Sequence, residues 1–514
     1  MQSILRFPLF LKAVRYSSIM KFLVTTVFLL IVLSVYTQPE FILNDRCDEA
    51  YQDILSLKFD QAKTKLNTER LENPQNLYVD YLENYIDFLS IVISEDASLF
   101  QLLENNKSER INRIKKLDAQ SPYRNYLLGN IHLQWAVTRL KFKEYITAAY
   151  EINKAYRLLT ENKKDFPEFI PNNITLGVLH IMIGLVPDKY RWLLDIINME
   201  GDIELGKEEL KLVLDNSNEK EEYAYLKNEV LFYLGFVELN IYPDKKELDF
   251  LLSQLENEEG DNLLLSYLTI NILMRTGNNE LVLEKFKQLP DPGSYFQFSY
   301  LDYLEAESHL RKLDLKAAEI KYKSFLEGFN GQNYIKDAFR KMAWTALLNN
   351  DTLRYQELMI RLQDKGQTNV GQDIDAMREA NENKLPNTEL IRSRLLFDGG
   401  YYQESDSILD ALSLSAVKKD DLLELTYRRA RIAHKQNNFQ KAKLLYKETI
   451  DLGKESPRYF AGNAALKLGE IYEAELAMNE AAIYYTSCLD LDFEEFEAGI
   501  HSKARAGLKR VTEK

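Results

Sequence analysis

The fold is decided by residues 465–491, which read ALKLGEIYEAELAMNEAAIYYTSCLDL. Apolar and small residues recur every three or four positions on both sides of a short polar break, which predicts two consecutive helices. Gly469 and Ala481 are expected to face each other where the helices cross, because only small side chains allow a close approach there. Tyr472 and Tyr485 are expected to fill the wider space beside the crossing. The stretch therefore predicts an antiparallel helical hairpin.

The same small and aromatic pattern recurs through the C-terminal half of the chain. The small residues of three successive second helices, Ser405, Ala442 and Ala481, lie 37 and 39 residues apart, slightly above the ~34 of a tetratricopeptide repeat. The hairpins resemble that repeat (TPR), and the resemblance implies that neighbouring hairpins stack into a superhelix with a concave binding face. The residues predicted to pack the repeats are Ala306, Ala318, Tyr322, Gly400, Tyr402, Ala430, Ala442, Tyr446, Gly469, Tyr472, Ala481 and Tyr485.

The rest of the chain also favours helices. Every long segment after Gln38 has helical periodicity, and no run alternates as a strand would. The 514 residues contain 12 Pro and 20 Gly, which is few for a fold rich in turns. We therefore predict an all-α fold, a TPR-like α–α superhelix built as a solenoid of antiparallel helix hairpins.

Prolines, glycines and polar stretches divide the chain. Leu289–Gly293 contains two prolines and a glycine, so it is the best internal boundary. Gln363–Leu385 is polar and weakly periodic, which predicts a mobile loop. We expect a signal peptide over residues 1–37, N-terminal helical hairpins over 38–165, an apolar helix with further helical pairs over 166–290, and a C-terminal TPR array over 291–514.

The first 37 residues have the pattern of a secretory signal. Lys21 precedes an apolar run over residues 22–36, and Thr37 offers a small residue before a cleavage point. Translation starts at Met1 or at Met20. The run is short for a spanning helix, so we predict an exported protein of the periplasm or the extracellular space. The alternative is a chain anchored in the membrane by an uncleaved N-terminal segment.

Residues 169–215 show a second resemblance. Ile174–Val186 is almost wholly apolar, Pro187 ends it, and Gly201-Asp202 followed by Gly206 opens a later helix. This order of features is similar to the core of the tetratricopeptide repeat domain 39 family, which includes the inclusion-body-clearance proteins. The resemblance implies an all-helical adaptor without catalysis. With 13 residues the apolar helix is too short to span a membrane, and we expect it to be buried.

Several kinds of chemistry lack their sequence signals. There is no phosphate-binding glycine loop, no Gly-x-Ser-x-Gly and no His-Glu-x-x-His. Cys47 and Cys488 lie far apart without metal or redox spacing. We therefore predict a protein that is not an enzyme and that uses no cofactor or metal. The formal net charge of −14 disfavours non-specific nucleic-acid binding, so nucleic acid is excluded as a partner at this stage.

These observations predict a non-catalytic scaffold or adaptor that binds a protein or peptide in its concave face. The alternative is a structural subunit of a cell-envelope or secretion assembly. A third class, an enzyme whose site forms only in the fold, requires a deep polar pocket with clustered Asp, Glu or His.

Overall fold

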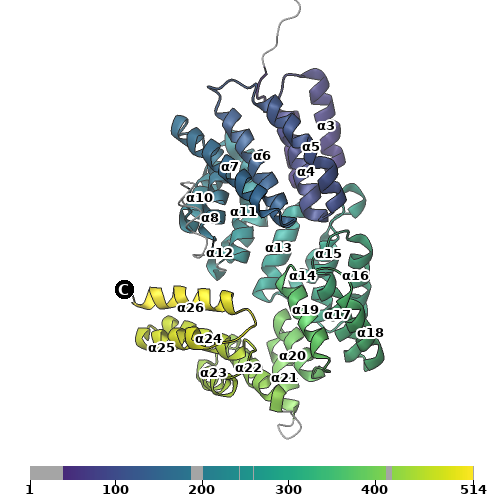
Figure 1. Cartoon of the computed structure of the whole chain (residues 1–514), viewed down its shortest axis with the longest axis vertical. Helices are drawn as coiled ribbons and strands as arrows, with labels where there is room; N and C mark the ends of the chain where they lie inside the picture. Colours follow the sequence, from purple (N-terminus) through teal and green to yellow (C-terminus); the bar gives the residue numbers. More distant parts are fainter. Residues whose placement is uncertain are drawn as a thin grey trace, which may run out of the picture.

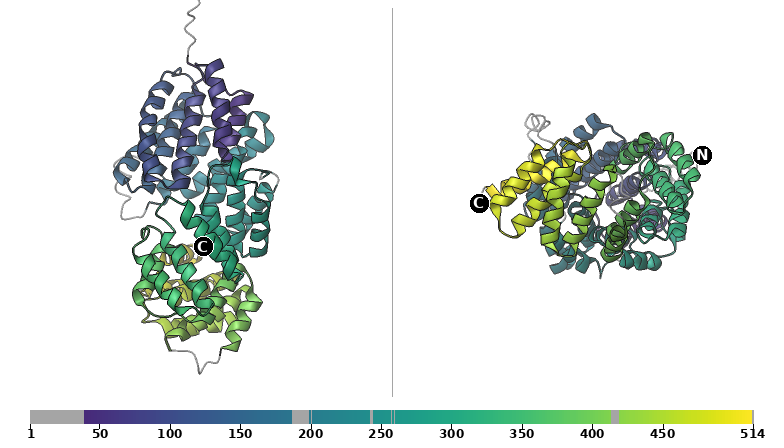
Figure 2. Two further views of the ribbon diagram at one scale, coloured as in Figure 1. Left: turned by 90° about the vertical axis from the view of Figure 1, so that its right-hand side faces the viewer. Right: turned by 90° about the horizontal axis from the view of Figure 1, so that it is seen from below.

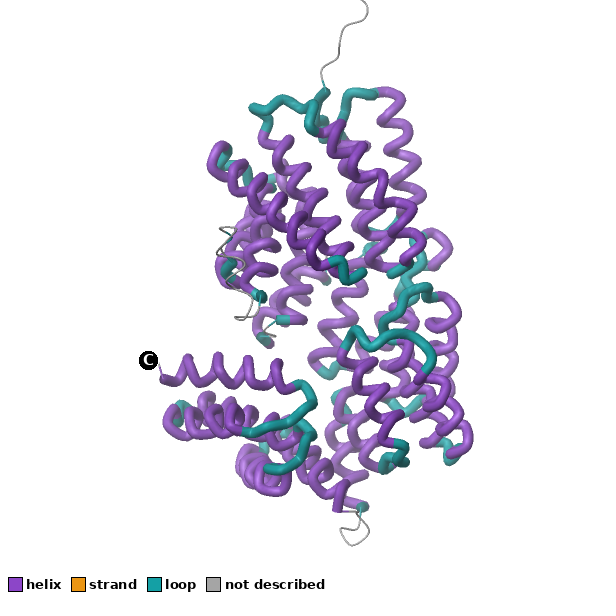
Figure 3. The backbone as a smooth tube through the Cα atoms, viewed as in Figure 1, coloured by secondary structure: helices purple, strands orange, loops and turns teal. Residues whose placement is uncertain are grey.

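The computed structural model describes residues 39–186, 199, 201–241, 244–256, 258, 260–412 and 419–512. The predicted signal peptide over residues 1–37 lies outside the described residues. Within them, helices follow one another along the chain, joined by turns (Figure 3), and the extended structure is an isolated bridge between Glu40 and Asn76.

The N-terminal part is a layer of antiparallel helices at the top of Figure 1. α2 pairs with α3, α6 pairs with α7, and α4 packs on α6. The helices of this part are α2 (Asp45–Leu55), α3 (Phe59–Glu72), α4 (Tyr78–Ser94), α5 (Ala97–Ile114), α6 (Pro122–Lys141), α7 (Tyr145–Asp165) and α8 (Asn172–Gly184).

The middle part continues the stack. α8 pairs with α10, and α11 packs on α13 and also reaches back to α2. Its elements are α10 (Ile203–Glu219), η2 (Glu221–Leu226), α11 (Lys227–Asn240), α12 (Lys245–Leu255), α13 (Leu263–Thr276), α14 (Asn279–Gln288) and η3 (Pro292–Ser294).

The C-terminal part consists of successive hairpins whose partners are neighbours in sequence: α15 with α16, α17 with α18, α20 with α21, α22 with α23, and α24 with α25. Its helices are α15 (Tyr300–Arg311), α16 (Leu315–Gly328), α17 (Ile335–Leu348), α18 (Thr352–Gln363), α19 (Gly371–Glu382), α20 (Thr388–Gly399), α21 (Tyr402–Ala411), α22 (Lys419–Lys435), α23 (Phe439–Gly453), α24 (Phe460–Ala474), α25 (Met478–Asp490) and α26 (Glu497–Thr512).

The path of the chain confirms the predicted all-α TPR-like superhelix. The apolar core of the described residues is divided into four clusters. The largest extends from Cys47 to Leu395, and the smaller ones lie within 174–272, 390–432 and 427–504. In the view from below, the C-terminal hairpins follow a curve (Figure 2), and α26 returns to lie beneath α12 (Figure 1). The curvature turns the inner helices of both halves toward a common interior.

The apolar helix of the sequence is α8, and most of its residues are buried. It packs on α10 through two glycines: a Cβ at Gly177 would lie 2.7 Å from the backbone oxygen of Gly206. No helix among the described residues is long and apolar enough to cross a membrane. Pro187, which is part of the resemblance over residues 169–215, lies outside the described residues.

The prediction of a mobile loop over Gln363–Leu385 is wrong. Gly371–Glu382 forms α19, in which Asp373, Ala376 and Ala380 are buried. The buried face of this helix has two alanines and one aspartate, so it gives only a weak apolar stripe and little periodicity to detect.

Candidate binding groove

The concave interior contains a cavity of about 1800 Å³, which we call the groove. Its walls come from both halves of the chain, because α4, α6, α8, α11 and α13 line one end while α15, α17, α20, α22 and α24 line the other. A cavity of this size suits a polymeric ligand as well as a small molecule, because small-molecule pockets measure roughly 300–1,000 Å³. The concave face predicted from the sequence is therefore a real hollow.

The end formed by α4, α6, α8 and α11 is apolar, and we call it the apolar wall. Phe236 is 51% exposed and Leu185 is 47% exposed, and both side chains line the groove. Phe88, Met182 and Phe232 lie half-buried beside them. Apolar side chains that gather in a hollow and keep contact with water are typical of an interaction site.

A buried carboxylate holds this wall in place. Glu229 of α11 is 2% exposed, and it accepts hydrogen bonds from Tyr85 of α4, at 2.7 Å, and from Tyr51 of α2. Burial raises the pKa of Glu229, while the tyrosine hydroxyls oppose that rise. The three residues join α2, α4 and α11, so they fix α11 to helices that are far apart from it in sequence.

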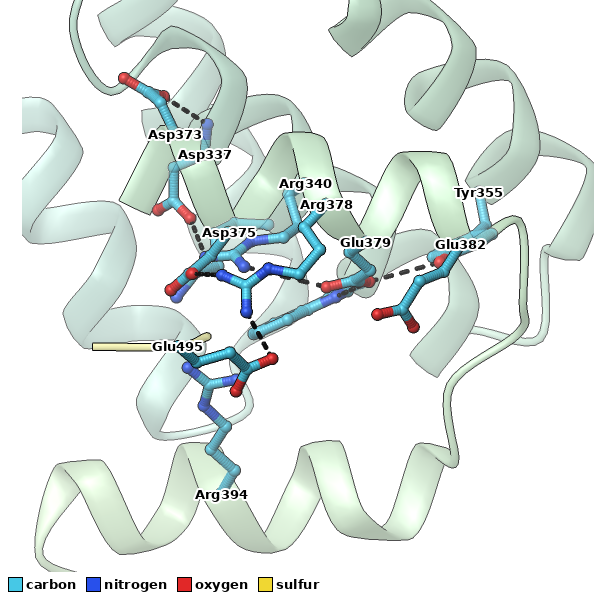
Figure 4. A network of polar contacts seen from close by, with 12 residues as sticks. Asp337, Arg340, Tyr355, Asp373, Asp375, Arg378, Glu379, Glu382, Arg394 and Glu495 are labelled. Carbon is cyan, nitrogen blue, oxygen red and sulfur yellow. Dashed lines mark hydrogen bonds and ion pairs between the residues drawn. The ribbon is translucent and has the colours of Figure 1, made fainter. Parts of the chain in front are cut away.

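The opposite end is held by a network of charged side chains (Figure 4). Asp373 of α19 accepts hydrogen bonds from the backbone N–H groups of Tyr334, at 2.6 Å, and Asp337, at 3.0 Å. These groups start α17, where a helix leaves N–H groups without an intrahelical partner. Burial raises the pKa of Asp373 to about 6, although the two N–H groups lower it. A side chain of α19 thus caps α17.

The same network continues from α17 to α19 and to the segment before α26. Asp337 pairs with Arg340 and accepts a hydrogen bond from Tyr303, and Arg378 pairs with Asp375 and with Glu495. These contacts therefore hold α17, α19 and the segment before α26 against one another.

Trp344 of α17 anchors a row of cations next to this network. Its indole N–H donates to Glu379 at 2.8 Å. Three cations lie close to its ring centroid: Lys341 at 4.9 Å, Arg340 at 5.1 Å and Arg394 at 5.3 Å. All three line the groove, and contact with an aromatic face stabilises a cation.

Arginines also surround a single carboxylate, that of Asp398 on α20. Burial alone would raise the pKa of Asp398, but Arg431, Arg394, Arg311 and Arg428 together hold it below its ordinary value. Of the residues that line the groove, nine are Lys or Arg and six are Asp or Glu. The groove is therefore basic inside a chain whose formal net charge is −14.

Most of the residues predicted to pack the repeats lie outside the groove. Tyr402 and Tyr446 line the groove, and Gly400, Tyr402 and Tyr472 are half-buried. The atoms nearest to Gly469 belong to the ring of Tyr485, and this differs from the expected contact with Ala481. The remaining predicted residues are buried between helices, namely Ala306, Ala318, Tyr322, Ala430, Ala442, Tyr446, Gly469, Ala481 and Tyr485.

The cations of the groove were not predicted from the sequence, although the spacing of three of them indicates their position. Arg394 and Arg431 lie 37 residues apart, the same separation as Ser405 and Ala442. Lys467 follows Arg431 after 36 residues. A basic residue thus recurs on the inner helix of three successive repeats, and a search for charge at the repeat spacing finds it.

No family model matches the chain, and no curated protein matches it. The resemblance of residues 169–215 to the tetratricopeptide repeat domain 39 family therefore stays a prediction. Among solved structures, a monomeric mutant of IFIT1 with Gppp-AAAA is similar at 12% identity over 92% of this chain and 95% of that chain, with a TM-score of 0.34. The human IFIT1 dimer with PPP-AAAA is similar at 12% identity over 92% and 96%, with a TM-score of 0.31. These likenesses concern the fold alone.

The exclusion of nucleic acid as a partner is corrected by this comparison, because the similar solved chains carry Gppp-AAAA and PPP-AAAA. The physical reason is that the net charge of a whole chain does not describe its interior. Here basic residues outnumber acidic ones in the groove although the chain is acidic. A net charge of −14 therefore does not exclude a nucleic acid from the groove.

Proposed function

We propose that this protein is a helical-repeat scaffold that binds a segment of another protein in the groove. The observation that carries the proposal is the apolar wall, where Phe236 and Leu185 keep about half of their surface exposed inside a cavity of about 1800 Å³. Water in such a hollow is displaced by apolar side chains at a gain of roughly 25 cal/mol per Å². A polypeptide supplies such side chains, whereas the backbone of a nucleic acid is charged at every step.

The rigidity of the walls supports binding without large rearrangement. The Glu229 hydrogen bonds fix the apolar wall, and the Asp373 cap fixes the opposite end. A preformed site loses less conformational entropy when the ligand enters. In this proposal the residues of the groove hold the ligand by apolar contact and by charge and take no part in a reaction, so the proposed role is non-catalytic.

We also propose that the scaffold works in an exported compartment, on the strength of Lys21 and the apolar run over residues 22–36. Sequencing the N-terminus of the protein recovered from its native source tests this. A start at Gln38 is expected, and a start at Met1 or Met20 contradicts a cleaved signal.

The experiment on the function is a peptide display selection against the purified full chain. Selected peptides are expected to bind about tenfold more weakly to Phe236→Ser, because truncation of a central apolar contact costs more than 1 kcal/mol. The matched control is Ile146→Ser on α7, since Ile146 is 91% exposed and lies outside the groove. Both positions are exposed, so neither variant is expected to unfold.

Two outcomes contradict the proposal. One is a set of selected peptides that bind Phe236→Ser and Ile146→Ser equally well. The other is a groove that binds a polyadenylate RNA with loss of binding in Phe236→Ser but binds none of the peptides.

A further inference from the structure

Five cations from four helices gather where the groove meets the C-terminal repeats, and we call them the cation cluster: Arg275 of α13, Arg431 and Lys435 of α22, Lys467 of α24, and Lys503 of α26. Four of them, all except Lys503, line the groove. The charge of Arg275 acts on both Lys435 and Lys503, which places the end of α13 near α22 and α26. The cluster is therefore built by the curvature of the superhelix, which brings α13 opposite helices that follow it by more than 140 residues.

Most members of the cation cluster have no anionic partner within the described part of the chain. Arg275, Lys435 and Lys503 form neither an ion pair nor a hydrogen bond through their side chains there. Lys467 pairs with Glu470 at 2.6 Å, and the guanidinium of Arg431 lies 4.2 Å from the ring centroid of Phe397. Elsewhere cations pair readily, as Lys207 does with Glu238 at 2.5 Å.

The members act on one another electrostatically. Burial lowers the pKa of Lys435, and Arg431, Lys467 and Arg275 lower it further. Burial also lowers the pKa of Lys503, and the nearby cations Lys467 and Arg275 add to the effect. Glu470, the acidic partner of Lys467, opposes part of this lowering. Like charges that outnumber their counterions at a site raise the free energy of the protein, and a bound anion relieves that cost.

The arrangement is preformed. Arg275 sits two residues before Gly277, whose carbonyl oxygen lies against Gly400. Next to that contact, Tyr401 donates a hydrogen bond to Glu280 at 2.7 Å and accepts one from Asn279 at 3.1 Å. The end of α13, which carries Arg275, is thus tied to the hairpin of α20 and α21. The helix α22, which carries Arg431 and Lys435, packs on that hairpin, so the cations are held in place before any ligand arrives.

We propose that the cation cluster binds the carboxylates of an acidic stretch in the protein segment whose apolar stretch contacts the apolar wall. This inference rests on the proposed function and adds a charge requirement and a direction to the ligand. Both sites line one continuous groove, so a single occupant meets an apolar end and a basic end. A polypeptide carries both kinds of side chain in sequence, whereas a nucleic acid presents a uniform charge along its length.

The test uses the full chain with three labelled probes at low ionic strength: polyglutamate, polyglutamine and a polyadenylate RNA. Fluorescence anisotropy is expected to show binding of polyglutamate that weakens with added salt and no binding of polyglutamine. Lys435→Gln and Arg275→Gln are each expected to weaken polyglutamate binding about tenfold. Lys441→Gln is the matched control, because Lys441 is an exposed lysine on the neighbouring helix α23 outside the groove.

Both groove variants are expected to fold, since Lys435 and Arg275 are only partly enclosed and form no ion pair or side-chain hydrogen bond within the described residues. The inference is overturned when polyglutamate binds no better than polyglutamine, when its binding survives both groove variants, or when the RNA alone binds at the cluster. The proposed function is tested separately, by the binding of the display-selected peptides to Phe236→Ser. Failure of the charge requirement therefore leaves the proposed function standing, and the two failures are distinguishable.

Discussion

Gly400 meets Gly277 backbone to backbone, because a Cβ at Gly400 would lie 1.9 Å from the carbonyl oxygen of Gly277. Both glycines have a positive φ, 88° and 78°, and each ends a helix. The contact joins the end of α13 to the end of α20. It is one of the points where distant turns of the superhelix touch, and it sets where Arg275 stands relative to the C-terminal repeats.

The first prediction concerns this contact. A Cβ at Gly400 collides with the backbone of Gly277, and the new residue must also keep the left-handed backbone conformation that glycine tolerates. Gly400→Ala is therefore expected to lower the free energy of unfolding by about 3 kcal/mol. The midpoint of urea denaturation measures this. The control is Gly499→Ala in α26, where a Cβ meets nothing within 4 Å and an alanine is expected to stabilise the helix by about 0.5–1 kcal/mol. Equal midpoints for the two variants contradict the contact.

The second prediction concerns the cap that Asp373 places on α17. Burial raises the pKa of Asp373 to about 6 from an ordinary value of 3.8. The folded protein therefore binds a proton more tightly than the unfolded chain between these values, and the contribution of Asp373 to stability falls as the pH rises from about 4 to about 6. Relative to Asp373→Asn, the wild-type protein is expected to be less stable at pH 7 than at pH 4.

Melting temperatures of both proteins across this pH range provide the measurement. The matched control is Asp364→Asn at the exposed end of α18, for which the difference from the wild type is expected to stay flat. A flat difference for Asp373→Asn as well excludes the raised pKa as a source of pH dependence.

The repeat spacing of small and aromatic residues suffices to predict the hairpins, because the packing of each pair is local. Ala442, Ala481 and Tyr485 were identified by spacing alone, and all three are buried. The helix α19 was not predicted, because its buried face has two small alanines and the charged Asp373, which give only a weak apolar stripe. The spacing of apolar residues thus predicts a helix that packs through apolar side chains, but it does not predict a helix that is held by charged ones.

The groove was predictable only in part. A concave face follows from stacking, but the residues that line it depend on the curvature of the whole superhelix. Arg275 joins Arg431 because Gly277 touches Gly400, and no local pattern encodes a contact between turns 123 residues apart. Arg394 and Arg431 carry a weaker signal in their 37-residue separation, which becomes meaningful once the inner helices are known.

The third prediction uses His434 as a probe of the cation cluster. Burial lowers the pKa of His434 to about 4, and the charge of Lys467 contributes. An NMR titration of the imidazole is expected to show a pKa well below 6.5, and Lys467→Gln is expected to raise it, because a repelling charge has gone. The neutral imidazole contributes stability that is complete above about pH 6.5 and is lost as the pH falls toward 4.

Lys441→Gln serves as the control and is expected to leave the titration of His434 unchanged. A pKa near 6.5 for His434 in the wild-type protein contradicts the enclosed position of the ring.

The last prediction tests the register of the final hairpin. Ala481 of α25 is 0% exposed, and α25 packs against both α24 and α26. A larger side chain at this position forces the helices apart, so Ala481→Leu is expected to lower the free energy of unfolding by about 1–3 kcal/mol. Ala474→Leu is the matched control, because Ala474 is exposed at the end of α24 and leucine there fills only solvent. Urea denaturation of the two variants separates the outcomes: a lower midpoint for Ala481→Leu alone supports the register, whereas equal midpoints place residue 481 away from the helix contact.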